Sequence, residues 1–153
     1  MTQAPFTGFP SGWFVVAFAG DIAADEIRAM HYFGRELVCF RGKSGKVHIL
    51  DAYCPHLGAH LGVGGVVEED SIQCPFHAWR FDGSGSCVEI PYASKIPRKA
   101  RLKSWPVRER NGLIFIFHDR HDREPTYEIP EIEEYGSEDW LPWTQSLLTI
   151  KTQ

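Results

Sequence analysis

The sequence predicts an all-β domain built from small antiparallel sheets. Short segments rich in β-branched and aromatic residues recur along the chain and are separated by turn residues, a pattern typical of strands. The chain has 14 glycines and 10 prolines among 153 residues, which favours short strands joined by tight turns. A chain of this length can bury a core as one domain.

Ten segments carry the strand pattern: Trp13–Phe18, His31–Phe33, Glu36–Arg41, Val47–Leu50, Val66–Val67, Ser71–Gln73, Trp79–Phe81, Cys87–Ile90, Trp105–Arg108 and Leu113–Phe117. Turn sequences join several of them, at His31–Arg35, Arg41–Lys46, Phe81–Ser86 and Arg110–Leu113. One stretch, Ile22 to Arg28, is helix-like but too short to change the fold class.

Charge and hydropathy exclude several classes of function. The net charge of −4 provides no overall attraction to nucleic acid or to a membrane surface. The longest apolar run, Trp13 to Ala19, falls well short of the ~20 residues that a membrane-spanning helix needs. The N-terminus lacks the features of a secretory signal. We therefore expect a cytoplasmic protein with no membrane span and no nucleic-acid partner.

Two of the four cysteines, Cys39 and Cys87, stand apart from any histidine. Cys39 lies in a strand-like run, where a buried structural thiol is expected, and Cys87 follows a turn. A reducing compartment accounts for all four cysteines without a disulfide.

Two charged blocks follow in the second half of the chain. Residues 95–110 hold seven basic side chains and one acid, Glu109. This basic block is interpreted as a solvated face, with a docking surface for an acidic reductase as the alternative. Residues 119–139 hold nine acids and two arginines, which indicates an extended connection leaving the domain.

The residues that indicate function lie in two short segments. Cys54–His56 reads C-x-H and Cys74–His77 reads C-x-x-H, with seventeen residues between them. Each segment offers one thiolate and one imidazole, and in each a proline follows the cysteine. Proline fixes φ and removes a backbone donor, so each loop is stiffened where a ligand must be held.

Two thiolates and two imidazoles suit a [2Fe–2S] cluster in which histidines replace cysteines on one iron. The irons are then inequivalent, and an added electron should reside on the histidine-bound iron and leave through the imidazole edges. A Cys₂His₂ zinc site is the alternative, because zinc accepts the same ligands. Zinc motifs usually pair like ligands, whereas each half is mixed here.

The sequence resembles the Rieske domain at the N-terminus of the large subunit of Rieske non-haem iron oxygenases. The likeness runs from about Pro10 to Asp119, through Gly12–Ala17, Leu50–His56, Cys74–Gly83 and Ile90–Tyr92. Ile96–Arg98, Ser104–Trp105 and Gly112–Ile116 resemble the branch that acts on sterols and 3-ketosteroids. The resemblance implies the Rieske fold and one [2Fe–2S] cluster per chain, with Cys54, His56, Cys74 and His77 as its ligands.

The chain departs from respiratory-chain Rieske proteins at four positions. Those proteins carry a disulfide between the two cluster loops, where this sequence has Ala59 and Phe76. They also place hydroxyl donors to sulfur where this sequence has Trp79 and Phe81. Fewer donors stabilise the reduced cluster less, so we expect a potential near the low end of the Rieske range, roughly −150 mV.

The resemblance also implies a separate catalytic domain with a two-histidine, one-carboxylate iron site. The remaining histidines, His31, His48, His60, His118 and His121, do not form the Asp-x-x-His-x₄-His arrangement of that site. The pair His118 and His121 falls in a charged turn, and His60 is expected to be a loop residue rather than a ligand. We therefore expect no catalytic residues in this chain.

We divide the chain into a Rieske domain, residues 1–120, and residues 121–153, an acidic connection followed by an apolar segment that resembles the start of a catalytic domain. The expected function is one-electron transfer from a flavin- or ferredoxin-type reductase to an oxygenase catalytic domain or subunit. A stand-alone Rieske ferredoxin serving a separate oxygenase is the alternative, which a chain running from Met1 to Gln153 would fit.

Overall fold

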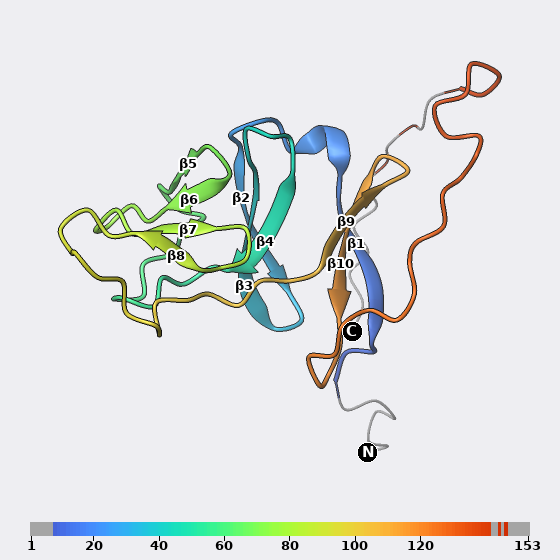
Figure 1. Cartoon of the computed structure of the whole chain (residues 1–153). Helices are drawn as coiled ribbons and strands as arrows, with labels where there is room; N and C mark the ends of the chain where they lie inside the picture. The colour runs from blue at the N-terminus through green and yellow to red at the C-terminus, as the bar shows by residue number, and fades with distance from the viewer. Residues whose placement is uncertain (1–7, 142–143, 145, 147–153) are drawn as a thin grey trace.

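Three small antiparallel sheets form the part of the chain that the computed structural model describes, residues 8–141, 144 and 146 (Figure 1). The only helical element in that part is one 3₁₀ turn, η1 (Ala19–Asp21), so the all-β prediction is confirmed. The apolar segment predicted at Leu147–Ile150 lies outside the described residues.

The first two sheets have three strands each. One has the order β1 (Gly12–Phe18), β10 (Leu113–His118) and β9 (Val107–Arg110), and the other β2 (Ile27–Tyr32), β3 (Arg35–Arg41) and β4 (Val47–Asp51). The β2–β3 hairpin turns at Phe33, whose ring stacks on Trp105 at 5.7 Å and lies 4.4 Å from the His118 ring. This aromatic contact joins the two sheets next to the buried core that contains Leu37, Ile114 and Ile116.

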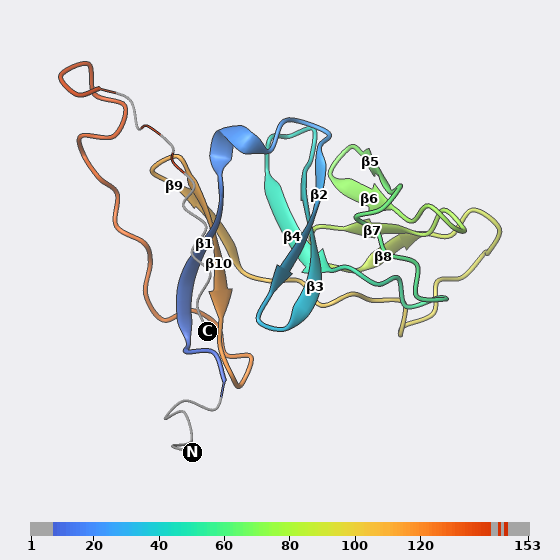
Figure 2. The same ribbon diagram turned by 180° about the vertical axis from the view of Figure 1, so that it is seen from behind.

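The third sheet has four short strands, β5 (Val66–Glu68), β6 (Ser71–Gln73), β7 (Arg80–Asp82) and β8 (Cys87–Glu89), in sequence order. Neighbouring strands of this sheet are antiparallel. The start of β5, the β6–β7 connection and the end of β8 therefore lie at the same end of the sheet. Both cysteine–histidine segments and residues 91–99 therefore project from that end (Figures 1 and 2). A second core, which includes Phe40, Leu61, Ile72 and Phe81, lies beneath it.

The ten predicted strands are confirmed, with shifts at their ends. The helix-like interpretation of Ile22 to Arg28 is wrong. The side chain of Ile22 is buried in the core, Asp25 has a positive φ of 60°, and Ile27 already pairs with Phe40 of β3. Pairing with a neighbouring strand outweighs helix propensity in a segment this short, because an isolated helical turn is costly to nucleate.

The acidic connection first runs beside the β1–β10–β9 sheet and then extends beyond it (Figure 1). Beside the sheet, the Trp13 indole donates to the Tyr127 carbonyl at 3.0 Å. Arg108 pairs with Glu128 at 2.7 Å, and Arg110 with Glu131. The hydrogen bond from Arg108 lowers the pKa of Glu128, so this pair is charged at neutral pH.

Removing the two anchoring acids should loosen this connection. In a Glu128→Gln, Glu131→Gln variant we expect amide hydrogen exchange at Ile132, whose N–H donates to the Asn111 side chain at 3.0 Å, to become several-fold faster. Glu133→Gln, Glu138→Gln makes the same charge change without removing an ion pair observed among the described residues, and should leave the rate unchanged. Equal acceleration in both variants would show that the ion pairs do not hold the segment.

Candidate metal centre

The two cysteine–histidine segments are built on one hydrogen-bonding frame. In ligand loop 1, residues 54–59, the Cys54 N–H donates to the Ala59 carbonyl and the Gly58 N–H returns to the Cys54 carbonyl, both at 2.9 Å. In ligand loop 2, residues 74–79, the Cys74 N–H donates to the Trp79 carbonyl at 2.8 Å and the Ala78 N–H to the Cys74 carbonyl at 3.1 Å. The same closed turn thus presents a cysteine and a histidine twice.

Each turn needs one residue with a left-handed backbone at its fifth position. Gly58 has a φ of 74° and Ala78 a φ of 56°. Glycine adopts this conformation without steric cost, whereas the alanine Cβ is strained in it. A glycine marks the first position in the sequence, whereas nothing marks the second, because alanine gives no sign of a left-handed backbone.

The two thiols are the buried part of the site. Cys54 and Cys74 are each 3% exposed and belong to the same buried core. Burial raises the pKa of the Cys54 thiol, and the adjacent Cys74 thiol adds to the rise, while a hydrogen bond from the His56 backbone opposes it. Two thiols held this close and this dry are costly to ionise unless a cation binds them.

The imidazoles are nearer to solvent than the thiols. The His56 and His77 rings are 4.7 Å apart, centroid to centroid, and both residues are half-buried. The Trp79 indole stacks on His56 at 4.6 Å with an angle of 6° between the planes. The Trp79 N–H donates to the Tyr92 hydroxyl at 2.6 Å, so a tyrosine outside the ligand loops fixes the indole that supports His56. No pattern in the sequence marks Tyr92 for this role.

These residues fit a [2Fe–2S] cluster with mixed ligands. Two soft thiols are adjacent and buried, and two imidazole rings are adjacent and half-buried, which is the pairing of like donors that a Rieske centre requires. Within the described residues, no group of three or more His, Cys, Asp or Glu converges where one metal ion would bind. A two-iron cluster needs no such convergence, since each iron takes only two protein ligands.

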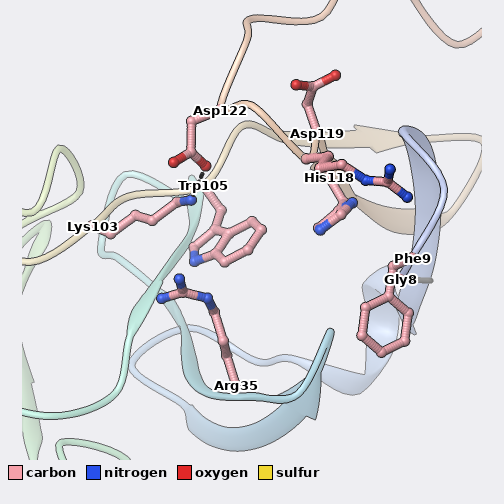
Figure 3. Close-up of a pocket in the computed structure, with 9 residues that line it drawn as sticks. Gly8, Phe9, Arg35, Lys103, Trp105, His118, Asp119 and Asp122 are labelled. Atoms are coloured by element: carbon pink, nitrogen blue, oxygen red, sulfur yellow. Dashed lines mark hydrogen bonds and ion pairs between the residues drawn. The ribbon is translucent and has the colours of Figure 1, made fainter.

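Two of the other histidines, His60 and His118, make structural contacts. His60 accepts a hydrogen bond from the Gly62 N–H at 3.0 Å and lies 3.8 Å from Glu36, so it ties the region after ligand loop 1 to the β2–β3 hairpin. His118 packs against Phe33 and Trp105. A cavity of about 340 Å³ opens beside His118, between Phe9, Arg35 and Asp122 (Figure 3), and none of its lining residues belongs to a ligand loop.

The two cysteines outside the loops are buried free thiols. Cys39 has no exposed surface, and burial raises the pKa of its thiol to about 12. Burial also raises the pKa of the Cys87 thiol, which donates to the Glu89 carbonyl at 3.4 Å. Both thiols are therefore protonated at neutral pH and unreactive, as expected for structural cysteines.

The fold and the donor arrangement define a class of protein, and sequence comparison agrees. The family model of the Rieske [2Fe-2S] domain matches residues 12–106, so the chain belongs to that family. Its cofactor is accordingly a Rieske-type [2Fe–2S] cluster, and the function that this cofactor implies is electron transfer.

The relatives are components of Rieske oxygenases. Cholesterol 7-desaturase of Ciona intestinalis is 49% identical over 129 residues, 84% of this chain and 27% of the relative. The oxygenase component of 3-ketosteroid-9-alpha-monooxygenase of Rhodococcus rhodochrous is 40% identical over 147 residues, 95% of this chain and 39% of the relative. The chain thus spans between about a quarter and two fifths of the length of these proteins.

Solved structures extend the likeness to the fold. Dicamba monooxygenase bound to dicamba superposes with a TM-score of 0.72 at 29% identity, over 83% of this chain and 40% of that one. A reduced complex between oxygenase and ferredoxin in carbazole 1,9a-dioxygenase superposes with a TM-score of 0.63 at 31% identity, over 72% of this chain and 29% of that one.

In the described residues, no helix is long and apolar enough to cross a membrane.

The left-handed position in ligand loop 1 can be tested with a matched pair of glycines. A Cβ at Gly58 or at Gly20 would meet no atom within 4 Å, but only Gly58 has a positive φ. Gly58→Ala should destabilise the chain by about 1 kcal/mol, whereas Gly20→Ala should be neutral or stabilise it by up to ~1 kcal/mol. Thermal unfolding followed by circular dichroism measures both. Similar shifts in the two variants would show that the turn does not depend on its backbone.

Proposed function

We propose that Cys54, His56, Cys74 and His77 hold the Rieske cluster, and that this chain is the electron-transfer domain of a Rieske oxygenase. The observation that carries this proposal is the repeated loop frame, which buries two adjacent thiols and holds two adjacent imidazoles nearer to solvent. A cluster bound there would accept and release one electron at a time.

The side chains around the ligands would serve this transfer in distinct ways. The buried thiols keep water away from one side of the site, while the half-buried imidazoles reach towards solvent, where a partner can approach. Stacking on Trp79 holds the His56 ring in one orientation, and the bond from Trp79 to Tyr92 prevents the indole from turning. A ligand fixed in this way needs little rearrangement when the charge of the centre changes.

The relatives support the wider assignment. Their names assign them to cholesterol and to a 3-ketosteroid, so we propose an oxygenase of the steroid class as the electron acceptor. We propose a reductase of the flavin or ferredoxin type as the donor, and the similar oxygenase–ferredoxin complex supports that choice. We keep residues 1–120 as the electron-transfer domain, with residues 121–153 leading to the acceptor. The free thiols of Cys39 and Cys87 support the proposal of a cytoplasmic, reducing location.

The ligand assignment predicts a clear division among the histidines. The purified chain should be red-brown, with two irons and two labile sulfides, and on reduction should give the anisotropic, low-average-g electron paramagnetic resonance signal of a mixed cysteine–histidine cluster. His56→Ala or His77→Ala should lose the cluster, and much stability with it, because cluster binding and folding are coupled. His121→Ala should keep the spectrum, and so should His60→Ala, at some cost in stability.

Two results would contradict this assignment. One is stoichiometric zinc without visible absorption in the wild-type chain. The other is an intact Rieske spectrum in His77→Ala.

The surroundings of the thiols predict a low potential. Phe81 is fully buried in the core that contains Cys54 and Cys74, and it has no hydroxyl to offer. The Trp79 N–H is already bonded to Tyr92. We therefore expect a potential of roughly −150 mV. Phe81→Tyr should raise it by tens of millivolts if the new hydroxyl donates to sulfur, since 59 mV corresponds to about 1.4 kcal/mol for one electron.

Voltammetry at fixed pH measures this potential. Phe115→Tyr, on the partly exposed strand β10, makes the same chemical change in the sheet that carries no ligand loop and should leave the potential unchanged. A wild-type value near +300 mV, or a decrease in Phe81→Tyr, would refute the low-potential account.

A further inference from the structure

The basic block of residues 95–110 is divided by the structure into two parts. Its later cations are neutralised or bonded: Arg101 donates to the Ser84 carbonyl at 3.5 Å, Lys103 pairs with Asp122, Arg108 with Glu128, and Arg110 with Glu131. Its earlier cations are Lys95, Arg98 and Lys99. They lie in residues 91–99, which are exposed throughout and contain no acid. Within the described part of the chain, these three cations make no ion pair.

The unneutralised cations lie beside the ligand loops. Residues 91–99 leave the four-stranded sheet between the buried residues Ile90 and Ala100, at the same end as both loops (Figures 1 and 2). The Tyr92 hydroxyl accepts the hydrogen bond from Trp79, whose indole stacks on His56. The basic segment is thus connected to a ligand histidine through two aromatic side chains.

The tips of the ligand loops are apolar and exposed. Leu57 follows His56 and is 65% exposed, while Phe76 precedes His77 and is 62% exposed, with its ring 3.9 Å from that of His77. Tyr92, at 63% exposed, adds a third large side chain. Exposed aromatic and aliphatic residues next to a rim of charge are typical of surfaces that bind another protein transiently.

We propose that Leu57, Phe76, Tyr92, Lys95, Arg98 and Lys99 form a docking face for an acidic one-electron carrier protein. The cations attract and orient the carrier, and the apolar tips exclude water where the two proteins meet. A reduced carrier bound here loses one electron and this domain gains one, with no bond made or broken. The proposal rests on the proposed function and adds the surface and the charge of the donor.

Binding can be measured without electron transfer by mixing two oxidised proteins. The probe is an acidic plant-type [2Fe–2S] ferredoxin, titrated calorimetrically into the cluster-loaded chain at low ionic strength. Lys95→Gln, Lys99→Gln should weaken binding about tenfold, and adding Arg98→Gln should weaken it further. The control Lys43→Gln, Lys46→Gln removes the same charge from exposed positions on the β3–β4 turn and should change binding less than twofold. High salt should abolish the difference.

Several outcomes would overturn the docking face. Equal weakening in both double variants would mean that only the total charge matters. Unchanged binding in Lys95→Gln, Lys99→Gln would mean that the carrier binds elsewhere. A self-associating wild type that this variant makes monomeric in analytical ultracentrifugation would assign the face to a second copy of the chain. The proposed function is checked separately by reducing each variant with dithionite: intact reduced spectra alongside failed docking would reject only the docking face.

Discussion

The structure depends on one requirement, that two thiols be buried beside each other while two imidazoles from the same loops reach the surface. A single closed turn meets it, with hydrogen bonds that return to the cysteine from both sides, and the chain uses this turn twice. The four-stranded sheet brings the two turns together at one end, because β5 and β7 start there and β6 ends there. The strands are only three residues long, so the core beneath the thiols, rather than sheet length, must provide the rigidity of the site.

Local sequence predicted much of this because the decisive signals are local. The two cysteine–histidine segments carry their donors within four residues of each other. The turns at Arg110–Leu113 and Phe81–Ser86 are specified by residues within the turns themselves. What could not be predicted depends on distant partners. Ile22 to Arg28 has residues that suit a helix, but β3 pairs with Ile27, and Ala78 accepts a strained backbone because loop 2 must match loop 1. The bond between Trp79 and Tyr92 joins residues 13 positions apart, for which the sequence carries no pattern.

The surroundings of the ligands separate two demands on an electron-transfer centre. The potential depends on the interior, where Phe81 offers no hydrogen-bond donor and the thiols are nearly inaccessible to water. The proposed partner recognition depends on the exterior, where the exposed residues Leu57 and Phe76 are adjacent to His56 and His77. Trp79 lies between these two regions, buried against His56 and bonded to an exposed tyrosine. Substitutions outside this contact can therefore change the affinity for a partner with little effect on the potential, or the reverse.

Charge along the chain shows why composition alone does not predict a surface. A net charge of −4 suggests no affinity for an acidic partner, and the basic block looks uniform in the sequence. In the folded chain, the acidic connection runs back along the β1–β10–β9 sheet and neutralises the part of the block near it. The part next to the ligand loops keeps its charge, because the connection does not reach that end of the molecule (Figure 1). The three cations left without an ion pair thus lie in the segment next to the loops of His56 and His77, the proposed ligands. At that position they would attract the proposed acidic carrier to the imidazole edges, whereas the same cations at the opposite end would attract it to a position too distant for efficient electron transfer.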